Sequence, residues 1–171
     1  MGDTTNFPNT VNVGVLSIAD TIVTATAAQI NGTTVGAVTS QTGATLAVTS
    51  AIAGVTNVLN KADGQAITLP AATGSGLVVR FLIGTTITSV GTTIAVTGDD
   101  VFRGFCTQFA DGGTTAAFYE AAGTNRITFD GSTKGGIIGD SIELIDMKLD
   151  TWFVNIIQSA TGAEATPFST V

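Results

Sequence analysis

From residue 55 onward, the sequence consists of short apolar or threonine-rich runs that are separated by glycine and aspartate turns. Examples are "TTIAVTG", "VFRGFCTQFA", "NRITFDG" and "TWFVNIIQSA". Runs of this length at regular intervals are typical of sandwiches and jelly rolls. We therefore predict an all-β fold whose core is an antiparallel β-sandwich or jelly-roll-like structure.

The amino-acid composition points the same way. The chain contains 31 threonine and 21 glycine residues but only three prolines. Threonine is β-branched and fits a pleated surface better than a helix interior, while glycine supplies tight turns. Only 11% of the residues are charged, against about 25% in an average protein. We therefore expect much of the threonine, alanine and valine surface to be covered in a specific oligomer.

The most hydrophobic run, "GLVVRFLIG", is predicted to be a strand with two apolar faces, as in a sandwich interior or a subunit contact. Its first face holds Leu77, Val79, Phe81 and Ile83, and its second Val78, Arg80 and Leu82. Just before it, "VTNVLN" and "AITLP" flank Asp63-Gly64 and predict a hairpin. The large side chains expected to fill the core are Phe81, Phe102, Phe105, Phe109, Phe118, Tyr119, Phe129, Trp152 and Phe153.

The first part of the chain differs from the rest, because residues 21–54 contain neither an aromatic nor a charged residue. Such small side chains bury too little area to offset the ordering cost of about 1 to 2 kcal/mol per residue, unless they lie on another chain. We predict an extended arm over 1–52, an antiparallel β core over 53–160 and an extended tail over 161–171. The arm side chains predicted to bind a partner are Phe7, Val11, Val13, Val15, Leu16, Ile18, Ile22, Val23 and Ile30.

Several classes of function are disfavoured by the residues themselves. The net charge is −7 and the six Lys and Arg residues lie singly along the chain, so we expect no nucleic-acid partner. No apolar run approaches the roughly 20 residues of a membrane span, and the first residues lack the basic region of a secretory signal. The absence of histidine excludes Ser-His-Asp and Cys-His catalysis. Cys106 lies between aromatic residues and is predicted to be a buried, unreactive thiol.

The turn Gly74-Ser75-Gly76 superficially resembles a phosphate-binding loop. A P-loop requires a lysine after its last glycine and then a helix whose amides face the phosphate. Here the turn leads into the strand "LVVRFLIG". We therefore predict a corner between strands, in which glycine adopts angles that other residues avoid.

Acidic residues offer two further alternatives. Asp140, Glu143 and Asp146 supply carboxylates for a glycosidase-type pair, although a solvated strand edge is the simpler interpretation. Asp99, Asp100 and Asp140 lie in glycine turns and leave a calcium site open, because calcium binds carboxylate and carbonyl oxygens. We expect no enzyme activity and no cofactor.

Four segments resemble a known family. "TATAAQING" is similar to short segments of tailed-phage fibre and head-surface proteins. "AITLPAATGSGLVVRFLIGTTITS", "FDGSTKGGIIGDSIELID" and "ATGAEATPFS" resemble small phage virion proteins, among them the head decoration, or cement, proteins. The resemblance implies a virion protein on the outer capsid surface that binds the major capsid protein as a homo-oligomer, commonly a trimer, and stabilises the shell by bridging subunits. The arm is longer than in that family.

The alternative that remains is a receptor-binding tip module of a tail fibre or head fibre. In that case, surface turns such as Asp111-Gly112-Gly113 would recognise the receptor. The chain has no long repetitive shaft, which favours the decoration protein.

Overall fold

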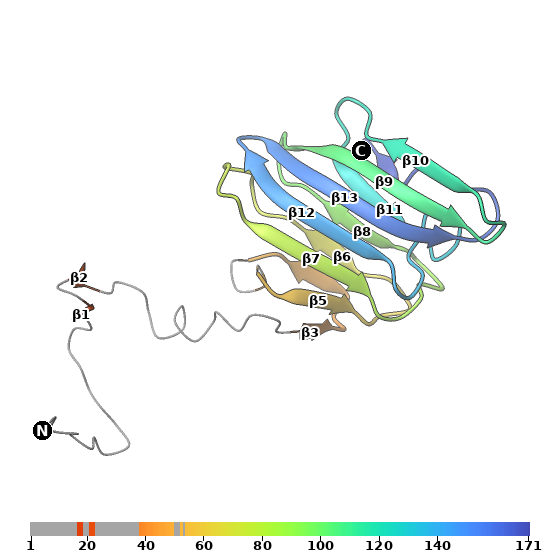
Figure 1. Ribbon diagram of the computed structural model, residues 1–171, viewed down its shortest axis with the longest axis horizontal. Helices are drawn as coiled ribbons and strands as arrows, with labels where there is room; N and C mark the ends of the chain where they lie inside the picture. Colours follow the sequence, from red (N-terminus) through yellow and green to blue (C-terminus); the bar gives the residue numbers. More distant parts are fainter. Residues whose placement is uncertain (1–16, 19–20, 23–37, 50–51, 53) are drawn as a thin grey trace, which may run out of the picture. The chain divides into compact units, whose positions relative to one another are not determined.

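The computed structural model describes residues 17–18, 21–22, 38–49, 52 and 54–171 (Figure 1). The chain divides into two compact units, residues 1–34 and 35–171. In the first unit, the two-residue strands β1 (Ser17–Ile18) and β2 (Thr21–Ile22) pair in antiparallel orientation. All other strands belong to the second unit.

The second unit is a sandwich of two sheets, and the predicted all-β fold class is confirmed. Among the described residues there is no helix that could cross a membrane. The strands are β3 (Val38–Gln41), β4 (Thr45–Ala47), β5 (Thr56–Leu59), β6 (Ala66–Thr68), β7 (Val78–Ile83), β8 (Thr92–Ala95), β9 (Val101–Ala110), β10 (Thr115–Tyr119), β11 (Arg126–Phe129), β12 (Ser141–Lys148), β13 (Thr151–Ala160) and β14 (Phe168–Ser169). The seven-stranded sheet has the order β10-β9-β13-β12-β7-β5-β3, and the five-stranded sheet has the order β14-β11-β8-β6-β4 (Figure 1).

Strands β3 to β8 wind as three successive coils, because consecutive strands alternate between the two sheets. Within each sheet the coils stack in parallel, β3 on β5 on β7 and β4 on β6 on β8. The sheets are therefore mixed rather than purely antiparallel. The hairpin predicted around Asp63-Gly64 is wrong, since β5 and β6 lie in different sheets and this turn joins the two layers. Turn residues mark a change of direction but do not specify which strand will pair with which.

The second half of the unit is mainly antiparallel. β9 and β10 form a hairpin, β12 lies between β7 and β13, and β11 pairs with β8 and β14. The exception is the ten-residue parallel pairing of β9 with β13. These long strands extend the seven-stranded sheet well beyond the coils (Figure 1).

The core lies between the sheets and is filled by the inward side chains of both. The two faces predicted for β7 differ in burial: Val79, Phe81 and Ile83 are buried, while Arg80 and Leu82 on the other face are exposed. The largest fully buried side chains are Trp152, Phe81, Phe102 and Phe129, together with Ile67, Leu69, Ile83, Ile94, Ile127, Ile142, Leu144 and Ile156.

Residues 38–49, which the sequence analysis assigned to the arm, form the first coil of the sandwich. Leu46 packs against the core and Val48 is buried in it. Short side chains suffice here because the coil adds only one edge strand to each sheet, while the other strands supply the large side chains of the core. The second unit begins at residue 35, and the first described strand of its sandwich begins at Val38. Residues 38–49 are therefore the part of the predicted arm that belongs to the sandwich.

Trp152 is the single tryptophan of the chain, and it is fully buried with its indole Nε1 donating to the carbonyl oxygen of Pro70 at 3.2 Å. We expect Trp152→Phe to lower the free energy of unfolding by about 1 to 3 kcal/mol, because it removes buried volume and orphans the Pro70 carbonyl. Urea unfolding followed by circular dichroism measures this loss. Tyr119→Phe on an exposed strand is the control, and equal midpoints for both variants would contradict the prediction.

Candidate functional site

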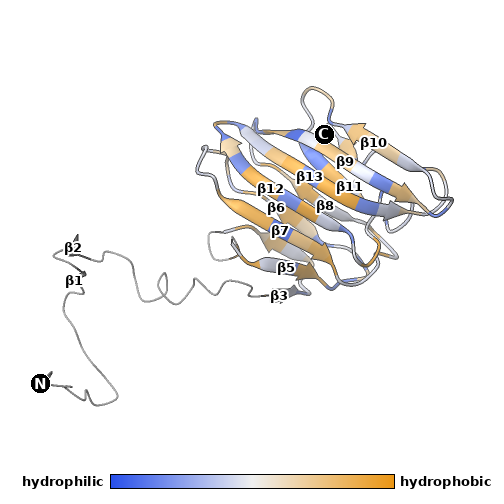
Figure 2. Ribbon diagram, viewed as in Figure 1, coloured by the Kyte–Doolittle hydropathy of each residue, from blue (hydrophilic) through white to orange (hydrophobic). Residues whose placement is uncertain are grey.

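The most unusual surface of the sandwich is the outer face of the seven-stranded sheet. Side chains on this face alternate with the buried ones, yet several are large and apolar. Figure 2 shows the hydrophobic (orange) and hydrophilic (blue) stretches along the ribbons of this sheet. Phe105 is 39% exposed, Phe109 50%, Tyr119 76% and Ile157 50%. We call these four residues the β9–β13 patch.

The strand register places the members of the patch on adjacent strands. Tyr119 on β10 lies opposite Phe105 on β9, and Phe105 lies beside Asn155 on β13. The ring of Phe105 also meets that of Phe153 edge to face, with centroids 6.5 Å apart. Ile157 lies two residues beyond Asn155 on the same face. The patch therefore spans three neighbouring strands.

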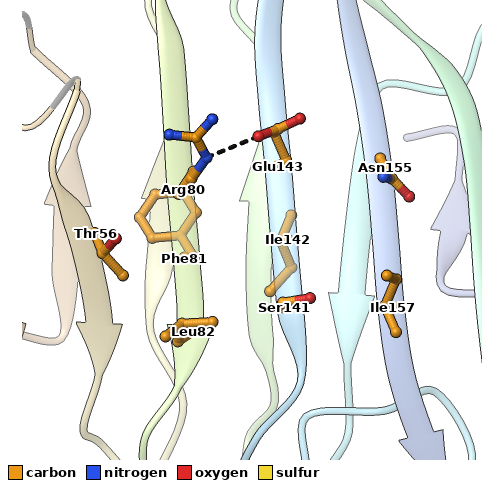
Figure 3. A pocket seen from close by; sticks show the side chains of 9 residues that line it. All are labelled: Thr56, Arg80, Phe81, Leu82, Ser141, Ile142, Glu143, Asn155 and Ile157. Atoms are coloured by element: carbon orange, nitrogen blue, oxygen red, sulfur yellow. Dashed lines mark hydrogen bonds and ion pairs between the residues drawn. The ribbon is translucent and has the colours of Figure 1, made fainter. Parts of the chain in front are cut away.

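An open groove of about 280 Å³ continues from the patch across β13, β12 and β7 (Figure 3). Ile157 and Asn155 line it on one side and Leu82 on the other. The Nε of Arg80 donates to Glu143 Oε2 at 2.7 Å across its wall. Because both partners of this ion pair are partly exposed, it contributes little to stability, but it cancels both charges locally.

The outer face of the five-stranded sheet is the natural comparison. Its strands direct Ile67, Ile94, Ile127 and Phe129 inward, where they are buried. The residues between them that face outward are short or polar, and they include Thr45, Ala47, Ala66, Thr68, Thr93, Ala95 and Thr128. This is the normal pattern for a solvated sheet, so the apolar patch on the other sheet calls for an explanation.

A second feature is the end of the sandwich formed by the first coil. Within the described residues, β3 and β4 each have a hydrogen-bonded neighbour on one side only, β5 and β6. Ala44 O accepts from Ala66 N and Val48 N donates to Thr68 O, so the alternate residues Thr45 and Ala47 direct their N–H and C=O groups to the open side. We call β3 and β4 together the open edge.

The open edge lacks the features by which proteins usually prevent unwanted strand pairing. Residues 38–49 contain no charged residue and no proline, and Val38 on β3 is exposed. The other end of the seven-stranded sheet, β10, is followed directly by Glu120. Edge strands without charge or proline readily pair with a further strand.

The loop Gly74-Ser75-Gly76 does bind an anion, but the anion is a side chain of the same chain. The carboxylate of Asp146 accepts hydrogen bonds from the backbone N–H groups of Thr73, Gly74 and Ser75, at 2.7 to 3.2 Å. The hydroxyls of Thr73 and Ser75 also donate to it. This confirms the prediction of a corner, with Gly74 and Gly76 both at positive φ.

The hydrogen bonds to Asp146 shift its titration. Burial opposes ionisation, but the Ser75 hydroxyl and the amides of Ser75, Gly74 and Thr73 outweigh it and hold the pKa of Asp146 well below its usual range. The carboxylate is therefore ionised and fully engaged in fastening β12 to the loop before β7. A group in this state has no free oxygen for proton transfer.

The three carboxylates considered for glycoside hydrolysis are not brought together. Glu143 points to the outer face and Asp146 to the inner face of β12, as their alternation along one strand requires. Asp140 is buried at the start of β12, where it accepts from the amides of Gly136, Ile137 and Ser159. Burial raises the pKa of Asp140 even though these amides favour the charged form.

The acidic turns considered for calcium are also separate. Asp100 is buried and accepts from the amide of Ala72 at 2.7 Å, while its neighbour Asp99 is exposed. In the part of the chain that the structure describes, no three acidic, histidine or cysteine side chains gather in a way that could hold a metal ion.

Cys106 lies on the inner face of β9 and is fully buried. Burial, reinforced by the charge of Asp140, raises the pKa of its thiol to about 12. The predicted role as a small buried hydrophobe is confirmed, since a thiol with this pKa forms almost no thiolate near neutral pH.

The sequence alone places every aromatic residue from Phe81 to Phe153 in the core, so it does not predict the β9–β13 patch. Phe105, Phe109 and Tyr119 are exposed instead. The sequence does contain a signal for the exposure of these rings. Residues 103, 105 and 109 lie on the same face of a strand, so Phe105 and Phe109 share a face with the charged Arg103.

The arm residues predicted to bind a partner fall almost entirely outside the described residues. This holds for Phe7, Val11, Val13, Val15, Leu16, Val23 and Ile30. The backbones of Ile18 and Ile22 lie in β1 and β2. The predicted partner contacts of the arm thus stay a prediction.

Comparison of the chain with protein-family models, with curated proteins and with solved structures found no match in any of the three.

Proposed function

We propose that the chain is a non-enzymatic structural protein of a tailed-phage virion. In this proposal it decorates the outer surface of the head as an oligomer and stabilises the shell by bridging neighbouring major capsid protein subunits. The sequence resemblance to decoration proteins motivates the proposal, and the engagement of Asp140 and Asp146 with backbone amides is consistent with a protein that performs no acid–base chemistry.

The observation that supports it best is the open edge. β3 and β4 are the last strands of the two sheets, and their free backbone groups can pair with a strand from another chain. Addition of a strand gives firm attachment through backbone hydrogen bonds without a deep pocket, which suits a protein that binds a broad shell surface. Residues 1–37, which precede this edge in sequence, lie within the predicted arm, so the arm leads directly into the open edge.

The proposal is tested with undecorated heads of the phage whose genome encodes the chain. Full-length protein should sediment with the heads, and antibody label on complete virions should be distributed over the head. Thr45→Pro removes an N–H group on the open side of β4 while leaving the bonds of β4 to β6, and it should weaken attachment at least tenfold.

The matched control is Ala163→Pro, which introduces the same residue in an exposed loop. It should bind heads as the wild type does. Equal attachment of Thr45→Pro and wild type would refute strand addition at this edge. Label confined to the tail would refute the decoration role and favour the fibre tip.

A further inference from the structure

We propose that the β9–β13 patch is a self-association surface that binds the same face of a second copy of the chain. The proposed function requires an oligomer but does not say which surface forms it. The patch is separate from the open edge, since β9, β10 and β13 lie at the end of the seven-stranded sheet opposite to β3. One copy can therefore use the two surfaces at the same time.

The apolar area of the patch matches that of a stable interface. Added together, the exposed parts of Phe105, Phe109, Tyr119 and Ile157 equal about two whole large side chains, or roughly 400 Å². A standard interface buries about 800 Å² per partner, of which somewhat more than half is apolar. The four side chains thus provide nearly all the apolar area that one partner contributes.

The residue types also suit an interface. Aromatic residues are enriched at contacts between proteins, and two phenylalanines and a tyrosine supply most of this patch. Phe105 already contacts Phe153 edge to face, which restricts the rotamers of its ring before association. An ordered aromatic side chain loses little conformational entropy when it is covered.

The charges on this face permit a second copy as the occupant. The chain carries a net charge of −7, so two copies repel each other on average. On this face, however, Arg80 pairs with Glu143 at 2.7 Å and Arg103 pairs with Glu120 at 3.5 Å. Because each pair is neutral, two such faces can approach without meeting like charges.

The groove beside the patch gives the contact its shape. It is bordered by Leu82 on one side and by Asn155 and Ile157 on the other (Figure 3). Asn155 pairs with Phe105 on β9, so the groove adjoins the patch. In the proposed contact, Tyr119 of the facing copy enters this groove of about 280 Å³, and the rings of the patch cover the strands beside it. Burial of an aromatic side chain in a groove is the usual arrangement at the centre of an interface.

The test is to measure the molecular mass of the full-length protein by sedimentation over a range of protein concentrations. Wild type should self-associate, and Ile157→Glu and Tyr119→Glu should each weaken self-association about thirtyfold or more, as expected for loss of a central contact. Ile138→Glu adds the same charge at a site that is 64% exposed and lies in the loop before β12, so it should behave as the wild type. Circular dichroism verifies that all three variants fold.

A mixture of charge-swapped variants decides which surfaces meet. Ile157→Lys alone should also dissociate, but an equimolar mixture of Ile157→Lys and Tyr119→Glu should associate again, because the lysine of one copy then faces the glutamate of the other. Failure of the mixture to associate overturns the pairing of like faces.

Two other results would overturn the proposal. One is a monomeric wild type at every concentration, even if the patch variants lose head attachment, since the patch would then bind capsid protein instead. The other is unchanged association of both patch variants. Loss of head attachment by Thr45→Pro with self-association intact concerns only the open edge, so the two proposals fail separately.

Discussion

Asp146→Asn will lower the free energy of unfolding by about 3 to 5 kcal/mol, because it disrupts several buried hydrogen bonds to a charged acceptor at once. The carboxylate accepts from the amides of Thr73, Gly74 and Ser75 and from two hydroxyls. Asparagine replaces one oxygen by an NH₂ group that faces these donors and leaves some of them unpaired. In a chain of this size the midpoint of thermal unfolding should fall by about 10 °C or more. Urea and thermal unfolding followed by circular dichroism measure both changes.

The same substitution has a defined pH dependence. The pKa of Asp146 is lowered in the folded protein, so its carboxylate stabilises the fold above the ordinary aspartate pKa of about 4 and loses this effect as the pH falls toward the folded-state value. The difference in stability between wild type and Asp146→Asn should therefore shrink below about pH 4. Asp140, whose pKa is raised, is present in both proteins and cancels in the difference.

Asp111→Asn is the matched control for Asp146, because it removes the same charge from an exposed turn. Its unfolding midpoint should agree with that of the wild type. A stability difference between wild type and Asp146→Asn that stays constant down to pH 2 would contradict the ionised state assigned to Asp146.

Much of the fold could be predicted from local sequence patterns. The alternation in "LVVRFLI" correctly separates the buried Val79, Phe81 and Ile83 from the exposed Arg80 and Leu82. The glycines of Gly74-Ser75-Gly76 correctly indicate a corner. Both features depend on residues that are close in sequence, where side-chain period and backbone freedom decide the structure.

The pairing of strands could not be predicted in this way. β5 and β6 are separated by a typical hairpin turn, yet each pairs with a strand two positions along the chain, β7 and β8. A two-residue alternation is the same in parallel and antiparallel strands, so it cannot distinguish a coil from a hairpin. The choice depends on contacts between residues that are distant in sequence.

The partner of the Gly74-Ser75-Gly76 loop could not be predicted either, because it is distant in sequence. Ser75 and Asp146 are 71 residues apart, and a carboxylate on a strand looks the same in sequence whether it faces solvent or a loop. Glu143 and Asp146 are only three residues apart, but they lie on opposite faces of β12. Glu143 pairs with Arg80 on the outer face, whereas Asp146 binds the loop at Ser75. Here strand alternation could have predicted the opposite faces but not the partners.

Gly131→Ala will lower the free energy of unfolding by about 3 kcal/mol or more. Gly131 has a φ of 78°, which costs a residue with a Cβ about 1 to 2 kcal/mol. In addition, a Cβ at this position would overlap the carbonyl oxygen of Ile87. Ile87 is buried, and its amide donates to Gly136 O at 2.9 Å, so it cannot move away without disturbing the core. Chemical unfolding followed by circular dichroism measures the loss.

Gly113→Ala separates the two causes of this loss. Gly113 has nearly the same φ, 79°, but a Cβ there would meet no atom within 4 Å. It should therefore lose only the backbone contribution of about 1 to 2 kcal/mol, and the difference between the two variants measures the cost of displacing Ile87 from the packed layer between the sheets. If both variants lose the same stability, the loop after β11 moves without cost to make room for the added Cβ. The close approach of Gly131 to Ile87 would then place no constraint on the sandwich.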